Sequence, residues 1–216
     1  MTVANRERGE SAAHIVLVVE NNSVPFDRRV WKESVSLRRV GYDVSVICPR
    51  SDRDPASYDY LEGIHIYRYR DLPSRGTAAG FVLEYANALL RIFCRLASMR
   101  VRRRIAVLHA ANPPDFFWPL ALIGKLVGTK FVYDQHDLGP EMFRSKFGDG
   151  PILRFLAWNE HLSQRFADAV IFCNRSLQKR SAARWQLIER KSYIVYNGPS
   201  DDFGPRHNPV LHRRME

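Results

Sequence analysis

Three residues that could do chemistry, His136, Asp137 and Glu141, follow an apolar run that ends at Asp134. An imidazole in such a place can donate to a group on which negative charge builds during a reaction. Carboxylates accept hydrogen bonds from hydroxyl groups. His136 is therefore a candidate catalytic residue, and the two acids are candidate substrate-binding residues. The alternatives are a histidine that caps a backbone group and carboxylates that cap a helix or pair with Arg144.

Three further polar residues, Asn22, Arg28 and Asn112, are candidates for substrate binding because they also follow apolar runs or open helices. Arg28 and Arg29 stand at the start of a predicted helix, where a cation opposes the positive end of the helix dipole. This misfit indicates an anionic ligand, and pairing with a nearby carboxylate such as Glu33 is the alternative. For Asn112, which precedes two prolines, the alternative is a turn-forming role.

The elements that must position these side chains alternate along the chain. Short β-branched runs predict seven strands, at 14–19, 44–48, 64–69, 106–110, 130–134, 169–173 and 193–196. Amphipathic stretches predict helices at 27–40, 81–99, 116–127, 151–167 and 176–185, and Gly41 stands where a left-handed helix stop belongs. The polar segments 50–63 and 135–150 predict loops.

This alternation predicts one α/β domain of the Rossmann-like kind, with a mostly parallel sheet and helices on both faces. In such sheets, ligands bind outside the carboxyl ends of the strands, which is where the candidate residues lie. The sequence therefore predicts a single ligand-binding edge.

The chain is basic, with 33 Lys and Arg against 23 Asp and Glu and a net charge of +10. Such a surface attracts polyanions, including anionic lipid headgroups. The densest run, at 100–104, ends the predicted helix 81–99 and is also typical of a solvated helix end. Because no nucleic-acid-binding motif accompanies the charge, nucleic acid is not an expected partner.

The segment 81–99 is long and apolar, but Glu84, Arg91 and Arg95 interrupt it. A membrane-spanning helix would bury these charges at a cost of about 2.5–3.5 kcal/mol each, so we do not expect one. Its apolar stripe favours packing against the sheet, and an interfacial helix on an anionic membrane is the alternative. The three scattered cysteines contain no CxxC pair, which argues against a disulfide framework or zinc site and fits a reducing cytoplasm.

Four segments in order resemble the family 4 glycosyltransferases. They read DRRVWKE at 27–33 with GYDV at 41–44, YDQHDLGPE at 133–141, Glu160 with RFADAVI at 165–171, and VYNG at 195–198 with Asp202 and Phe203. The resemblance covers residues 14 to 204 and implies the N-terminal, acceptor-side half of a GT-B fold.

The resemblance also implies an activity: transfer of a sugar, with retention, from a nucleotide-sugar donor to a glycan or lipid-linked acceptor, in surface polysaccharide or glycolipid synthesis. His136 would face the interdomain cleft and donate to the donor sugar or its pyrophosphate, because departure of a nucleoside diphosphate builds negative charge. No cofactor or metal is expected. The implied location is the cytoplasm, with the inner face of the plasma membrane as a candidate site.

The chain departs from the family in two places. Residues 20–26 read ENNSVPF, where many members carry two glycines, and the chain contains no sequence for the second domain, which binds the nucleotide sugar. We therefore expect a polar tail at 1–13, the N-terminal domain at 14–196, and a hinge at 197–216 that leads to a missing C-terminal donor domain. The chain alone is expected to be inactive.

Two other functions compete with this one. A non-catalytic Rossmann-like module that binds a polyanion would use the basic surface alone. A nucleotide-sugar 2-epimerase-like half would need further cleft carboxylates, of which no clear set is present. A dinucleotide dehydrogenase is a weaker alternative still, because no GxGxxG follows the first strand. The segment 52–54 mimics the DxD metal motif of the other large glycosyltransferase fold, but its polar surroundings favour a solvated loop.

Overall fold

The computed structural model describes residues 12–72, 78–184 and 190–198. Its elements are β1 (His14–Val18), α1 (Arg28–Arg39), β2 (Asp43–Pro49), β3 (Tyr58–Leu61), β4 (Ile64–Tyr69), α2 (Ala78–Arg102), β5 (Ile105–Ala111), α3 (Trp118–Leu126), β6 (Lys130–Gln135), α4 (Gly139–Phe147), α5 (Pro151–Phe166), β7 (Ala169–Phe172), α6 (Arg175–Arg184) and β8 (Ser192–Ile194). Most of the expected tail and the residues Asp202 and Phe203 lie outside the described part of the chain.

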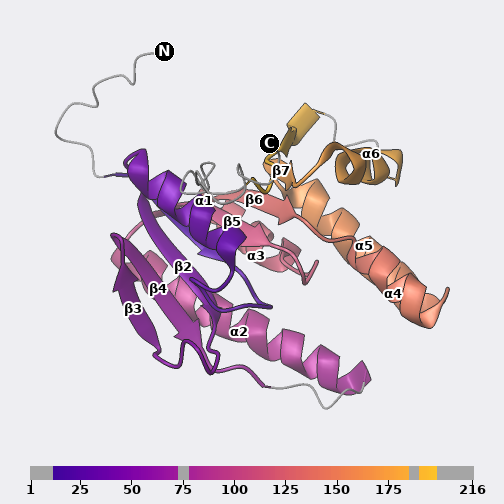
Figure 1. Cartoon of the computed structure of the whole chain (residues 1–216), viewed down its shortest axis with the longest axis horizontal. Coiled ribbons are helices and arrows are strands. Elements are labelled where there is room, and N and C mark those ends of the chain that lie inside the picture. Colours follow the sequence, from indigo (N-terminus) through magenta and orange to yellow (C-terminus); the bar gives the residue numbers. More distant parts are fainter. Residues whose placement is uncertain (1–11, 73–77, 185–189, 199–216) are drawn as a thin grey trace, which may run out of the picture.

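The strands form one sheet in the order β3-β4-β2-β1-β5-β6-β7-β8 (Figure 1). Each neighbouring pair is parallel except β3 and β4. Every residue of β1 is buried, as expected for a central parallel strand covered on both faces. The predicted α/β fold is therefore confirmed, and the parallel pairing brings the carboxyl ends of β1, β5 and β6 to one edge.

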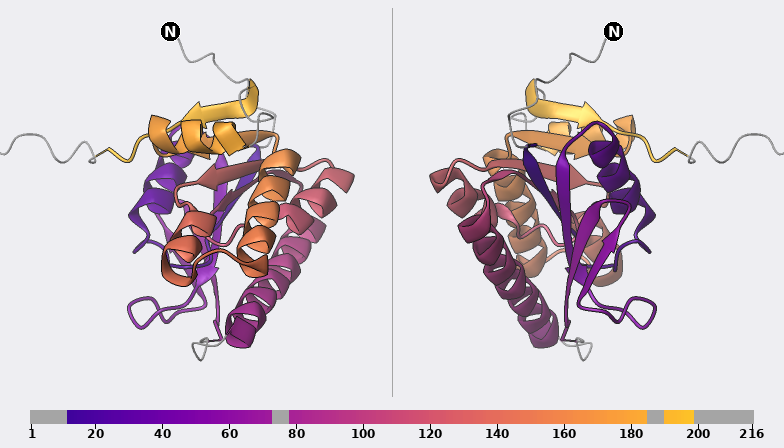
Figure 2. Two further views of the ribbon diagram at one scale, coloured as in Figure 1. Left: turned by 90° about the vertical axis from the view of Figure 1, so that its right-hand side faces the viewer. Right: turned by 90° about the vertical axis from the view of Figure 1, so that its left-hand side faces the viewer.

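Helices cover both faces of the sheet, and α1 and α2 lie on opposite sides of it (Figure 2). On the α1 side, Val30 belongs to the same buried cluster as Leu17 and Val46. On the other side, Ile92 and Met99 of α2 pack into a cluster that also takes residues from α3, β6 and β7. The stripe of α2 is thus a core-packing stripe, as the sequence favoured.

Three local expectations were wrong. The polar segment 50–63 contains β3, which pairs antiparallel with β4. The turn between them consists of Glu62 and Gly63, both with positive φ, as a two-residue hairpin requires. The expected loop 135–150 contains α4, which Pro140 helps to begin because its fixed φ suits a first helical turn. The last strand ends at Ile194 rather than at residue 196.

Gly41 has a φ of +93° directly after the end of α1, and a side chain added there would meet no atom within 4 Å. Only backbone conformation therefore opposes a larger residue. We expect Gly41→Ala to lower the free energy of unfolding by about 1–2 kcal/mol, the cost of a left-handed L-residue. Urea denaturation measures the change. Gly198→Ala is the control because that position is equally open and not left-handed, and an equal loss in both variants would contradict this account.

Candidate functional site

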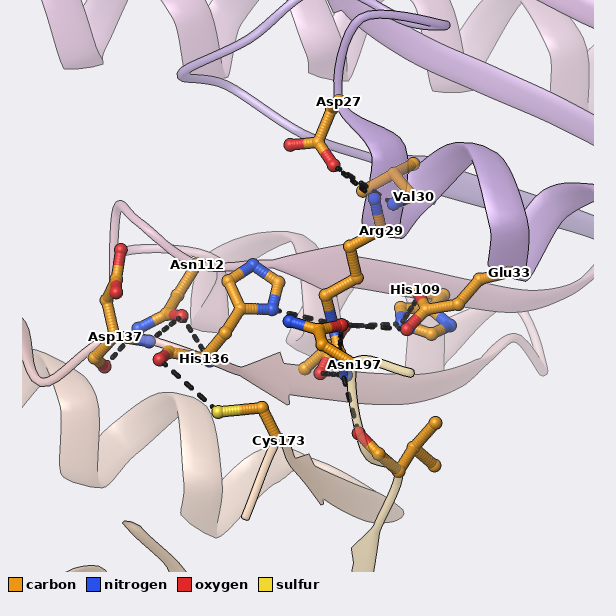
Figure 3. A network of polar contacts seen from close by, with 12 residues as sticks. Asp27, Arg29, Val30, Glu33, His109, Asn112, His136, Asp137, Cys173 and Asn197 are labelled. Carbon is orange, nitrogen blue, oxygen red and sulfur yellow. Dashed lines mark hydrogen bonds and ion pairs between the residues drawn. The ribbon is translucent and has the colours of Figure 1, made fainter. Parts of the chain in front are cut away.

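A fully buried carboxylate, Asp134, lies near the carboxyl end of β6. It is the common partner of Arg29, His109 and His136, whose side chains point toward one another in Figure 3. Arg29 reaches it from α1 and forms a two-pronged pair, with Nε donating to Oδ2 at 2.9 Å and Nη2 donating to Oδ1 at 2.7 Å. The side chain of Asp134 is 0% exposed, so water does not weaken this pair. The pair links α1 to β6.

Two histidines face the same carboxylate. Nδ1 of His136 lies 3.4 Å from Asp134 Oδ2, and Nε2 of His109 lies 3.6 Å from the same oxygen. His109 Nε2 also lies 3.5 Å from Glu33 Oε2. At these distances the contacts are electrostatic rather than hydrogen bonds of ordinary length. The His136 side chain is 17% exposed, and because Nδ1 faces Asp134, Nε2 is the ring nitrogen available to a ligand.

The network sets the charges of its members. Burial alone would raise the pKa of Asp134, but His109, His136 and Arg29 hold that pKa well below its usual range. Burial alone would lower the pKa of His109, yet Asp134 and Glu33 raise it above its ordinary value. Burial raises the pKa of Glu33. Asp134 is therefore ionised at neutral pH, and its Oδ2 is an acceptor that faces the His136 ring.

Asn112 positions the backbone that carries His136. Its Oδ1 accepts from the backbone N–H groups of His136 and Asp137, at 2.8 and 3.1 Å, and its Nδ2 donates to the carbonyl of Asp137 and to Asp115. Asn112 is 0% exposed, so its amide has no group left for a substrate. Its predicted role in substrate binding is replaced by the turn-forming role, the alternative that the sequence left open. Cys173 adds a weak Sγ contact to the His136 carbonyl at 3.7 Å.

A second group of acids lies next to this turn. Glu141 of α4 pairs with Arg184, which also lies 3.4 Å from Glu160 of α5. Glu160 is fully buried, and burial is the main cause that raises its pKa to about 8. The predicted alternative of a Glu141–Arg144 pair was wrong, because Arg144 pairs with Asp149 instead.

The remaining candidates lie where a ligand could reach them. Asn22 is half-buried in the loop after β1, and Asp137 is half-buried beside His136. Arg28 is exposed on α1, and no ion pair involves it within the described residues. The carboxylate that the sequence offered as a partner for the arginine pair, Glu33, lies 3.2 Å from Arg29.

The same arginine also contacts the segment that follows β8. Nη1 of Arg29 donates to the carbonyl of Val195 at 3.2 Å and to Asn197 Oδ1 at 2.7 Å. Lys32, one turn further along α1, donates to the carbonyl of Gly198 at 2.7 Å. Every nitrogen of the Arg29 guanidinium is thus engaged within the chain, which makes Arg29 a positioning residue rather than a ligand contact.

Sequence reasoning did not assign roles to Asp134 and His109. Each stands within a buried strand, where a charged or titratable residue without a partner is costly. That cost was the signal available in the sequence. The contact between His109 and Asp134 became visible only in the structure, where β5 pairs with β6 and Ala111 lies opposite Asp134. For Glu160, which is also buried, the sequence predicted no role beyond its place in the resemblance to the family 4 glycosyltransferases.

Three groupings bear on metal binding, one of which is Glu20, Asp71 and Glu84, whose possible ligand atoms lie within 4.8 Å of one another. Glu33, His109 and Asp134 offer possible ligand atoms within 4.8 Å of one another, but both Asp134 oxygens accept from Arg29, whose guanidinium already supplies positive charge there. In the segment 52–54, Asp54 accepts from Ser23 at 2.5 Å and lies 3.8 Å from Arg68, while Arg53 lies over the ring of Phe26. Asp54 is therefore engaged in holding its loop.

Comparisons with known proteins agree on the class of molecule. The model of Glycosyltransferase Family 4 matches residues 27–203. Sucrose-phosphate synthase from Thermosynechococcus elongatus is similar in fold, with a TM-score of 0.62 and 12% identity over 87% of this chain and 48% of that one. The catalytic domain of Starch Synthase IV from Arabidopsis thaliana, bound to ADP and acarbose, is also similar. Its TM-score is 0.53, with 12% identity over 89% of this chain and 53% of that one.

A plant structure extends this set. UGT2 of Phytolacca americana, complexed with UDP-2fluoro-glucose and pterostilbene, has a TM-score of 0.59 and 13% identity over 88% of this chain and 56% of that one. The chain thus spans about half the length of the solved structures that it matches. Among the described residues, no helix combines the length and apolar character needed to cross a bilayer.

The first prediction from the site concerns Asp134→Asn. The change removes the fully buried counter-charge of Arg29 and His109 and leaves them Glu33 as a neighbouring carboxylate. We expect a loss of about 3–5 kcal/mol in the free energy of unfolding. Asp149→Asn is the matched control, because it breaks an exposed arginine pair, which we expect to cost at most about 0.5 kcal/mol. Similar small losses in both variants would show that the buried pair does not hold the site together.

The second prediction concerns pH. Glu160 has a folded-state pKa of about 8 against an ordinary value of 4.5. The folded chain therefore binds this proton more tightly, so the stability it contributes is complete below pH 4.5 and is lost as pH rises through 8. Glu160→Gln removes this titration. We therefore expect the free energy of unfolding to fall less between pH 5 and 8 in this variant than in the unmodified chain, by at least about 1 kcal/mol.

Chemical denaturation at a series of pH values measures this slope. Asp52→Asn, at an exposed loop position, is the control and should follow the unmodified chain. Parallel curves for Glu160→Gln and the unmodified chain would mean that Glu160 is already ionised in the folded state.

Proposed function

Because this chain belongs to glycosyltransferase family 4, we propose that it is the acceptor-side half of an enzyme that transfers a sugar from a nucleotide donor. The acceptor is a glycan or a lipid-linked sugar, and transfer proceeds with retention at the anomeric carbon. The proposal further assigns the enzyme to surface polysaccharide or glycolipid synthesis at the cytoplasmic side of the membrane. It requires no metal.

The observation that carries this proposal is the orientation of His136. Its Nδ1 faces the ionised Asp134 at 3.4 Å, which leaves Nε2 at the carboxyl edge of the sheet. When a nucleoside diphosphate leaves the sugar, negative charge develops on its phosphate oxygens. To donate to that charge from Nε2 while Nδ1–H faces Asp134, the ring must carry a proton on both nitrogens, because a neutral imidazole has one donor and one acceptor. A donor that is already held in place then stabilises the charge without reorganising during the reaction.

Arg29 supports His136 without touching the substrate. Its two hydrogen bonds fix the position of Asp134, and its charge helps to keep Asp134 ionised. The ionised Asp134 can accept from Nδ1–H of His136 and so fixes the orientation of the ring. The buried pair therefore prepares the histidine before any substrate arrives.

The acceptor side of the proposal uses the residues around this edge. Asn22, Asp137 and Glu141 are assigned to acceptor hydroxyl groups, since amides and carboxylates accept hydrogen bonds from them. Arg28, exposed near the start of α1, is assigned to an anionic group on the acceptor. The solved structures named above support this kind of ligand, because one is complexed with UDP-2fluoro-glucose and pterostilbene and another is bound to ADP and acarbose.

The donor site belongs, in this proposal, to a second domain. The chain spans about half of the matched structures, and Arg29 and Lys32 hold residues 195–198, which would lead to that domain. The 216-residue chain by itself should therefore transfer little sugar. Rapid transfer by the purified chain, measured with labelled nucleotide sugars, would contradict this division of the site.

The direct test replaces His136 in an enzyme completed by a donor-binding domain. We expect His136→Ala to lower kcat by about 100-fold or more, the range seen when one donor to a developing charge is removed. The melting temperature should change little because the side chain is partly exposed. His65→Ala, on β4 at the far side of the sheet, is the control. If both variants retain full turnover, His136 is not the catalytic residue.

A further inference from the structure

A basic groove lies between β4 and α2. The helix α2 covers the face of the sheet opposite α1, which carries Arg29 and Glu33 of the Asp134 network (Figure 2). Its volume is about 690 Å³. Its lining contains five arginines and no carboxylate: Arg50, Arg68, Arg70, Arg91 and Arg95. This groove is separate from the candidate site, because β4 and β6 are four strand spacings apart, roughly 19 Å.

The geometry of α2 explains how its arginines come to face the groove. Ala88, Ile92 and Met99 form the buried side of the helix. The groove is lined by the adjacent face, whose members recur three or four residues apart, as on one side of a helix: Asn87, Leu90, Arg91, Cys94, Arg95 and Ser98. The core packing of α2 therefore fixes the direction of the arginines beside it.

Arg68 differs from the other four arginines. It is buried and donates to the carbonyl of Val24, and it pairs with Asp59. Among the described residues, no ion pair involves the other four. Their positive charges are therefore not neutralised by the groove's own lining.

The contacts that these arginines do make leave their charge in place. Arg91 Nε donates to Asn87 at 2.9 Å, which orients the guanidinium without neutralising it. Arg95 lies over the ring of Tyr67 at 5.0 Å. The acid that follows Arg70 is Asp71, which clusters with Glu20 and Glu84 and on which Arg91 acts electrostatically. Burial raises the pKa of Asp71 and raises that of Glu20 to about 8, and both shifts weaken the offset that these acids give. The groove keeps an excess of positive charge.

We propose that this groove is a binding site for a phosphate-bearing ligand. Guanidinium groups recognise phosphate oxygens through paired hydrogen bonds, and several such groups around one cavity suit a diphosphate better than a single charge. Binding also relieves the repulsion among the four arginines. The proposal does not depend on sugar transfer, since the groove is remote from His136.

The residues around the groove favour a ligand that also has an apolar part. Leu90 lines the groove and is 62% exposed, and Leu83, two turns earlier on the same face of α2, is 63% exposed. A ligand that joins phosphate to an apolar chain matches this arrangement. The phosphate chemistry is common to a soluble diphosphate and to a lipid headgroup, and the test separates these sources.

The first arm of the test measures binding of inorganic pyrophosphate by calorimetry at constant ionic strength. We expect Arg91→Gln combined with Arg95→Gln to weaken binding at least about tenfold, the effect of losing one charge-assisted contact or more. Arg39→Gln combined with Arg154→Gln removes the same charge from exposed positions elsewhere and should bind as the unmodified chain does. Arg91→Lys combined with Arg95→Lys should bind with intermediate strength.

The second arm uses flotation with phosphatidylcholine vesicles, with and without phosphatidic acid. Recruitment that requires phosphatidic acid and is lost in the Arg91→Gln, Arg95→Gln variant supports the site and assigns it to a lipid headgroup. Pyrophosphate binding without recruitment supports the site and assigns it to a soluble ligand. The proposal is overturned if neither probe binds, or if binding is the same in the glutamine variant as in the unmodified chain.

Discussion

The pair between Arg29 and Asp134 is the contact on which the rest of the candidate site depends. A fully buried carboxylate is stable only with a partner, and Arg29 satisfies both of its oxygens. The ionised carboxylate then orients His136 and pairs electrostatically with His109. Because Arg29 also binds the backbone after β8, one guanidinium joins the first helix, the sixth strand and the segment 195–198.

The fold makes this convergence possible. Parallel pairing of β1, β5 and β6 places their carboxyl ends at one edge, so residues far apart in the chain meet there. Asn112, at the end of β5, secures the backbone of His136 through its buried amide. The helix α1 starts at the same edge because Asp27 caps its first turn by accepting from the N–H groups of Arg29 and Val30.

Much of this arrangement could be predicted from the sequence. Apolar runs such as 14–19 identified the core strands, and Gly41 marked the end of α1, because burial and backbone sterics act locally. The edge carrying His136 followed from the strand pattern. The hairpin β3–β4 and helix α4 were missed because polar residues obscure periodicity. The pairing of Arg29 with Asp134 could not be predicted from the sequence, because the two residues are 105 positions apart and only the pairing of strands brings them together.

The central claim is that the ionised Asp134 holds a proton on Nδ1 of His136. Nitrogen-15 NMR of the histidine rings, recorded near neutral pH with His136 assigned by its alanine variant, tests it most directly. The account predicts a protonated Nδ1 whose resonance shifts when Asp134 is replaced by asparagine. A neutral ring with its proton on Nε2, unchanged by that replacement, would contradict the account.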